Sequence, residues 1–179
     1  MSNSTHWLDD VDPALLPSLT RWFEHMDPSD LTLIVLKGHL LIEEKLDHVI
    51  EAMVPNSQHL REARLTFFQK MQLARSLCWE HPDSPEWGVI QAFNSVRNDL
   101  AHNLESDKLN DKIQRLVEAF LAGSDGILES GSLTRVGPAS SQVMWSTIYV
   151  IGFLARFEQG AKSLREALEL LHSTPPSDT

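Results

Sequence analysis

The helical character of this chain is clearest in residues 31–54, LTLIVLKGHLLIEEKLDHVIEAMV. Apolar side chains recur there at the spacing of one helix face: Leu33, Leu36, Leu40, Leu46, Ile50 and Met53. The preceding Asp27-Pro28-Ser29-Asp30 is typical of a turn that also caps a helix, and Pro55-Asn56-Ser57 is typical of its end. We therefore predict a helix over residues 31–54.

Prolines divide the rest of the chain into long segments with the same helical periodicity. No segment shows the alternation of apolar and polar residues that marks a strand. The other predicted helices are 13–26, 58–79, 85–104 and 106–123, followed by a long last helix whose apolar residues run from Val143 to Leu171. Gly152 and Gly160 could mark a bend in this last helix. The sequence predicts an all-α bundle of four or five main helices, a short leading helix and a long C-terminal helix.

We expect a single domain over residues 13–172, because 179 residues suit one domain. A flexible arm over 1–12 would precede it, and a disordered tail over 173–179 would follow it. Gly and Ser residues within 123–141 predict a mobile loop before the last helix.

The composition favours a globular chain with an acidic surface. Its 15 Lys and Arg stand against 25 Asp and Glu, which gives a net charge of −10. Because such a surface repels phosphate, we expect no specific DNA binding, and any contact with RNA must be made by a small local site. The single cysteine, Cys78, excludes an internal disulfide and a Cys-rich zinc site, and its place on an apolar stripe predicts a buried thiol.

Two features favour a cytoplasmic protein with no membrane contact. The first residues carry several aspartates and no basic or apolar run, so we expect no secretory signal. Residues 136–155 are uncharged, but only 143–155 are mainly apolar, which is too short a stretch to cross a bilayer.

The segment most suggestive of chemistry is residues 96–105, VRNDLAHNLE. Arg97 is followed by Asn98 and Asp99, and four residues separate Arg97 from His102. With this motif the chain resembles the HEPN superfamily of helical nucleotide-binding domains, whose signature is an arginine, a polar residue and a histidine near one end of a late bundle helix. The upstream segments KGHLLIEEKLDHVIE and RLTFFQKMQLARSL also resemble HEPN helices, and the resemblance covers residues 31–120.

The resemblance implies a HEPN-like up-down helical bundle and a metal-independent endoribonuclease that acts as a dimer. In that reaction a ribose 2′-hydroxyl attacks the adjacent phosphate. Arg97 and His102 of two protomers would form a composite catalytic site. No metal and no cofactor is expected. The expected partners are RNA, a second copy of the chain, and an antitoxin or another regulatory protein, since such enzymes act as toxins or phage-defence effectors.

The chemistry of these two residue types suits that reaction. A histidine can accept or donate a proton near neutral pH, so two copies of His102 could divide the roles of base and acid. The guanidinium of Arg97 stays ionised and can stabilise the charge that develops on the phosphorane.

Helix geometry limits what one protomer can do alone. Arg97 and His102 differ by about 140° around an ideal helix, so they do not share a face, whereas Asn98 and His102 do. We expect Asn98 to orient its neighbours or contact substrate. Asp99 is either a solvated helix residue or a member of the site, and Glu44 could line the cleft.

Structural roles for the motif residues are the alternative. Arg97 could pair with Asp99, Glu105 or another helix, and His102 could cap the carbonyls where its helix ends. We expect three further polar residues on the polar side of the helix over 31–54, namely His39, Glu43 and His48. Their spacing is possible for metal ligands but is not specific to a metal site.

Two non-enzymatic functions remain open. The mannitol-repressor family has a similar order of helices with a long final one, but it lacks a clear RNxxAH motif. A plain adaptor could instead bind a protein through the last helix. The RNDLAH segment favours the nuclease. Some HEPN toxins carry a tyrosine two residues after the histidine, which a partner modifies; here that position is Leu104, so this control is not expected.

Overall fold

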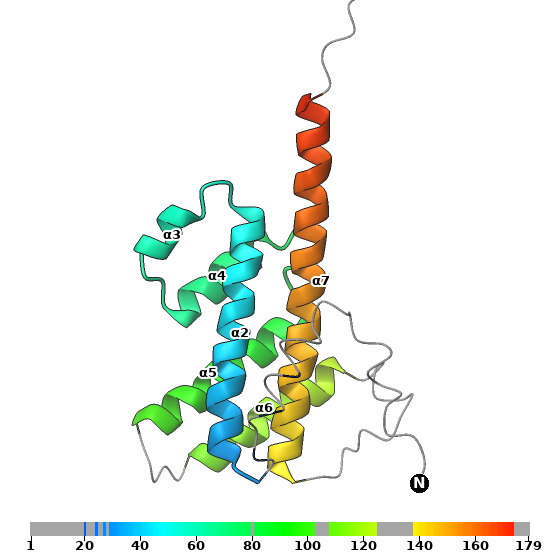
Figure 1. Cartoon of the computed structure of the whole chain (residues 1–179). Helices are drawn as coiled ribbons and strands as arrows, with labels where there is room; N and C mark the ends of the chain where they lie inside the picture. The colour runs from blue at the N-terminus through cyan, green and yellow to red at the C-terminus, as the bar shows by residue number, and fades with distance from the viewer. Residues whose placement is uncertain are drawn as a thin grey trace, which may run out of the picture.

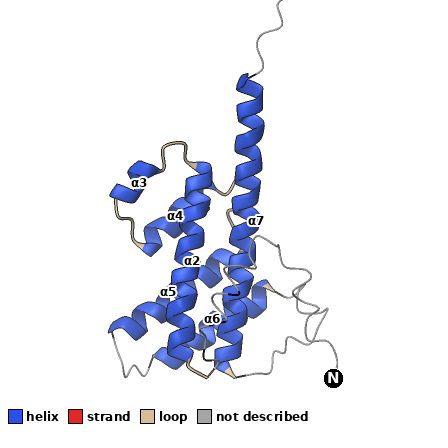
Figure 2. Ribbon diagram, in the orientation of Figure 1, coloured by secondary structure: helices blue, strands red, loops and turns tan. Residues whose placement is uncertain are grey.

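The computed structural model describes residues 20, 24, 27, 29–79, 81–102, 108–124 and 138–173. Within these ranges the chain is helical and contains no strand (Figure 2). The helices are α2 (Leu31–Met53), α3 (Gln58–Glu62), α4 (Phe67–Leu77), α5 (Pro85–His102), α6 (Leu109–Gly123) and α7 (Ala139–Ser173). The predicted all-α bundle with a long last helix is therefore confirmed.

Helices α2 and α7 lie side by side and run in the same direction (Figure 1). Gly38 of α2 meets Thr147 of α7, and further along both helices Lys45 Nζ donates to Glu158 Oε2 at 3.2 Å. The described helices share one hydrophobic core. Its largest fully buried side chains include Phe93, Ile34, Ile42, Leu46, Leu116 and Leu154.

Helices α5 and α6 cross this pair and run antiparallel to each other (Figure 1). Near one end, Asp99 of α5 pairs with Lys112 of α6. Near the other end, Pro85 lies beside Gly123. Helix α4 packs on α2 through Phe67, which stacks on His39. The middle of α5 thus crosses the N-terminal half of α2, where Phe93 lies beside Gly38 and Asn94 beside His39. The RNDLAH segment follows in the C-terminal turns of α5.

Gly38 allows three helices to meet at one point. A Cβ atom at this position would lie 2.8 Å from Phe93 Cζ of α5 and 2.9 Å from Thr147 Oγ1 of α7. Both distances are shorter than non-bonded atoms tolerate, so a glycine is needed for α2, α5 and α7 to approach this closely.

The predicted bounds of α2 are confirmed to within a residue, but its predicted apolar stripe is only partly correct: Leu46 and Ile50 are buried. The Asp30 side chain accepts a hydrogen bond from the Leu33 amide at 2.9 Å and caps the helix as expected. Leu36 and Leu40, which we placed on the buried face, are exposed, Leu40 to 64%. Because α2 contacts α4, α5 and α7, the buried arc is wide and is centred on a different side of the helix.

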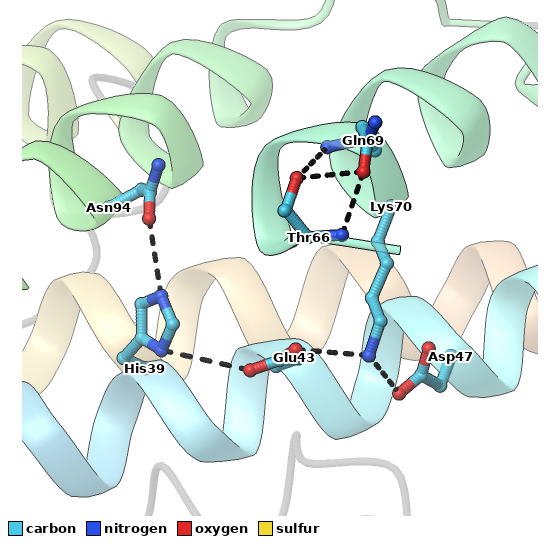
Figure 3. Close-up of polar contacts among 7 residues, drawn as sticks. All are labelled: His39, Glu43, Asp47, Thr66, Gln69, Lys70 and Asn94. Carbon is cyan, nitrogen blue, oxygen red and sulfur yellow. Dashed lines mark hydrogen bonds and ion pairs between the residues drawn. The ribbon is translucent and has the colours of Figure 1, made fainter. Parts of the chain in front are cut away.

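The predicted helix over 58–79 is also wrong, because two helices occupy these residues. Arg64 has a left-handed backbone with φ of 51°, which a continuous helix does not permit. Thr66 then starts α4 with a capping box (Figure 3). Its backbone amide donates to the side-chain Oε1 of Gln69 at 2.9 Å, and its hydroxyl accepts from the backbone amide of Gln69 at 3.4 Å. Cys78 is buried after α4, as predicted.

Helix α7 begins at Ala139 and continues through Gly152 and Gly160 without interruption. The predicted loop over 123–141 is shorter at both ends, since Gly123 belongs to α6 and Ala139 to α7. The C-terminal part of α7 projects beyond the other helices (Figure 1). Its exposed leucines are Leu164, Leu168, Leu170 and Leu171.

Some predictions lie outside the described residues: the arm over 1–12, most of the helix over 13–26, residues 125–137 of the loop, and the tail beyond Ser173. No helix in the described part of the chain has the length and apolar character needed to span a bilayer.

Candidate functional site

A buried polar cluster joins α2 to α5 beside the RNDLAH segment. His39 of α2 is only 4% exposed, which corrects our placement of it on the polar side of the helix. Its ring stacks on Phe67, with centroids 4.1 Å apart. Its Nε2 lies 3.3 Å from Asn94 Oδ1 of α5, and its Nδ1 lies 4.0 Å from Glu43 Oε2 (Figure 3). Both ring nitrogens therefore face polar partners inside the bundle.

The cluster extends from Glu43 to α4. Lys70 Nζ donates to Glu43 Oε1 at 3.0 Å and to Asp47 Oδ2 at 2.7 Å (Figure 3). Partial burial works against the charge of Lys70, but these two carboxylates outweigh that effect and raise its pKa. Lys70 therefore stays protonated and fixes Glu43 beside His39.

Arg97 lies one helical turn after Asn94, close to this cluster. It is half-buried, and its Nη1 donates to Asn98 Oδ1 at 3.3 Å. Within the part of the chain that the structure describes, no carboxylate lies within ion-pair distance of its guanidinium. The pKa of His39 is lowered chiefly by burial, with a further contribution from the positive charge of Arg97; the Asn94 hydrogen bond and Glu43 oppose both. The charge of Arg97 thus reaches His39.

Asp99 does not belong to this arrangement. It is 6% exposed, so it is not the solvated helix residue that we held open. Its Oδ1 accepts from Lys112 Nζ of α6 at 2.7 Å. Asp99 therefore connects α5 to α6. The structure does not contain the pairing of Arg97 with Asp99 that was one of the alternatives.

The remaining candidates are placed less completely. His102 is the last residue of α5, and its side chain lies outside the described part of the chain. Asn98 is exposed beside Arg97. Glu44 is exposed on α2, about 140° around the helix from His39, so it does not share the face that meets Asn94. The proposed pairing of Arg97 with Glu105 lies outside the described residues.

The sequence interpretation did not name Asn94 or Lys70 and placed His39 on the wrong side of its helix. Asn94 is one turn before Arg97, a spacing at which helix neighbours touch, and this signal was available. His39 could not be placed from periodicity, because its burial depends on where α4 and α5 cross α2. Among the residues that the structure describes, no three His, Cys, Asp or Glu side chains gather in a way that could hold a metal ion.

A cavity of about 440 Å³ lies elsewhere, between the C-terminal end of α2, the start of α5 and α7. Its lining includes Trp79, Glu86, Arg156 and Phe157 and does not include Arg97. The cluster around Arg97 is therefore separate from this cavity.

Replacing Asp99 by asparagine should reduce stability and leave site chemistry unchanged. The change keeps the side-chain shape but leaves Lys112 facing a buried amide in place of a carboxylate, which should cost about 1–3 kcal/mol. Urea unfolding of the variant measures this cost. Asp111→Asn is the control, because Asp111 is exposed on α6. Unchanged stability in D99N would show that the pair between Asp99 and Lys112 contributes little to the fold.

A scan against protein-family models, a search of curated proteins and a search of solved structures each gave no significant match to this chain.

Proposed function

We propose that the chain is a metal-independent endoribonuclease of HEPN type that acts as a homodimer, in the role of a toxin or phage-defence effector. One observation carries the proposal: the RNDLAH segment forms the last turns of the bundle helix α5, where Arg97 is half-buried and hydrogen-bonded to Asn98.

The proposed reaction assigns one role to each motif residue. The 2′-hydroxyl of a ribose attacks the adjacent phosphorus, the 5′-oxygen leaves, and a 2′,3′-cyclic phosphate forms. His102 takes the hydroxyl proton or supplies a proton to the leaving oxygen. Arg97 binds the phosphate and stabilises its developing charge. Asn98 accepts from the Arg97 guanidinium at 3.3 Å and helps to orient it.

A second protomer completes the site in this proposal. Residues 97 and 102 are about 140° apart on α5, so Arg97 of one copy is expected to work with His102 of the other. Two arginines and two histidines in one cleft would concentrate positive charge on an otherwise acidic body. An antitoxin or another regulatory protein could then act by covering this cleft.

The experiment that tests the reaction class uses RNA cleavage in excess EDTA. We expect the purified protein to cleave single-stranded RNA, to leave 2′,3′-cyclic phosphate ends, and to keep its full rate in the chelator. An oligonucleotide with 2′-deoxyribose at the cleaved positions should resist, because it lacks the attacking hydroxyl. Cleavage that stops in EDTA and returns with Mg²⁺ or Mn²⁺, or equal cleavage of the deoxy substrate, would contradict the proposal.

A second candidate function is a non-catalytic HEPN-like regulator or adaptor, similar to the mannitol-repressor family. The observation that favours it is the row of exposed leucines on the projecting end of α7. This candidate predicts no RNA cleavage under any condition, and loss of a protein partner on replacing Leu168 and Leu171 with serine.

A further inference from the structure

His39 is a buried, titratable side chain that the proposed reaction does not use. Its surroundings are defined on each packed helix. Glu43 faces it from α2 itself at 4.0 Å. Phe67 of α4 stacks on it, and Lys70 of α4 acts on it through Glu43. From α5 it meets the neutral amide of Asn94 and the charge of Arg97.

The contacts suit two protonation states of the ring. In the neutral tautomer with hydrogen on Nε2, that N–H donates to Asn94 Oδ1, and bare Nδ1 faces a carboxylate oxygen. A second proton on Nδ1 would turn the approach to Glu43 into an ion pair while keeping the bond to Asn94. Lys70 occupies the other oxygen of Glu43, so it does not compete for the proton.

Arg97 shifts the balance between these two protonation states. Burial and the nearby guanidinium both oppose a charge on His39, and together they lower its pKa. An anion bound to Arg97 would cancel the second effect. Asn94 connects the two residues, since it contacts His39 and lies three residues before Arg97, where side chains on one helix are neighbours.

We propose that His39 is a positioning residue linked to Arg97: when a phosphate group docks on Arg97, His39 takes up a proton and pairs more closely with Glu43, one turn along the same helix. That the anion is an RNA phosphate rests on the proposed function. The linkage itself concerns any anion at Arg97.

The sign of the effect follows from reciprocity. A lowered pKa means that His39 is neutral at pH 7 in the free protein. If anion binding favours the protonated ring, protonation must favour anion binding by the same factor. Anion affinity at Arg97 should therefore rise as the pH falls through the titration of His39, below the ordinary histidine value of 6.5.

An NMR titration of the full-length protein tests the linkage without RNA cleavage. The imidazole signals of His39 are assigned by their loss in His39→Gln and followed over pH 4–8 alone, with inorganic sulfate, and with a 2′-deoxy dinucleotide that cannot be cleaved. Sulfate is a suitable probe because its charge is constant over this range. The variants are Arg97→Ala, Glu43→Gln and, as a matched control, Arg75→Ala, whose arginine pairs with Asp83.

We expect the pKa of His39 to rise in R97A, to fall in E43Q and to stay unchanged in R75A. Sulfate and the dinucleotide should raise it in the wild type and not in R97A. Sulfate should bind the wild type several-fold more tightly at pH 5 than at pH 7.5, and this dependence should be weaker in H39Q, where only the remaining titratable groups such as His102 contribute. An unchanged pKa in R97A, or equal responses to sulfate with and without Arg97, would overturn the proposal. The R97A and E43Q arms keep His39, so they decide the matter even where H39Q does not fold.

The outcome separates this inference from the proposed function. If the linkage is seen without RNA cleavage, the proposed nuclease activity is wrong and the proton-linked anion site stands. Cleavage without linkage would do the reverse. With both present, H39Q should move the acidic limb of the cleavage rate against pH, which a merely structural role would not do.

Discussion

Replacing Arg97 or His102 by alanine is expected to abolish RNA cleavage while the bundle remains folded. Loss of a general acid or base lowers a rate by about 100-fold to 10,000-fold, and loss of a donor to developing charge lowers it by about 100-fold to 1,000-fold. Each variant should therefore fall near background. Rates of cleavage of a fluorescent RNA in EDTA, with helicity from circular dichroism, measure activity and fold on the same samples.

The controls for these variants are an arginine and a histidine outside the cluster. Arg75→Ala removes a guanidinium on α4, and His59→Ala removes an exposed imidazole on α3. Both should cleave as the wild type does. In a bacterial host, the wild type should slow growth and R97A and H102A should not. Cleavage that survives both alanine changes would eliminate the proposed mechanism, and equal toxicity of all proteins would eliminate the toxin role.

The largest structural effect is expected from Gly38→Leu. A side chain here would enter space held by Phe93 of α5 and Thr147 of α7, at distances below van der Waals contact. Neither atom is at the end of a flexible exposed chain, so the helices must separate or the side chains must leave their favoured rotamers. Overpacking of this kind costs about 1–3 kcal/mol, and we expect the upper end or beyond. That is a large share of the stability of an ordinary domain.

Gly88→Leu is the matched control for this effect. It places the same side chain on α5 at a position where a Cβ atom meets nothing within 4 Å. Because leucine has a higher helix propensity than glycine, this variant should be as stable as the wild type or more stable. Urea midpoints compare the two directly. Equal midpoints for G38L and G88L would show that the three-helix contact at Gly38 is looser than described.

The helices that the sequence predicted well are those with local start and stop signals. Asp30 caps α2, Pro85 starts α5 and Gly123 ends α6, and each signal acts within one turn of the boundary. The failure at 58–79 has the same origin. Thr66 and Gln69 have the spacing of a capping box, and this local signal outweighs the apolar period that runs across both helices.

The candidate site was predictable in its motif and not in its surroundings. Arg97 and Asn98 lie together on α5, as the RNDLAH segment suggested. Asp99 is only two residues from Arg97, yet its side chain pairs with Lys112 of α6. His39 is far from Arg97 in sequence, yet its side chain contacts Asn94. Apolar periodicity identifies the face of a helix that is buried. Which other helix packs on that face depends on the crossing angles between helices, which no single segment encodes.

The parallel contact between α2 and α7 has a consequence for biosynthesis. Gly38 and Thr147 touch across most of the chain length, so the core is built from contacts of high sequence separation, which slow folding. Ile34, Ile42 and Leu46 of α2 are translated before α7, against which α2 packs. Until α7 is made, the nascent chain presents an unpaired apolar helix, which is the kind of surface that chaperones bind.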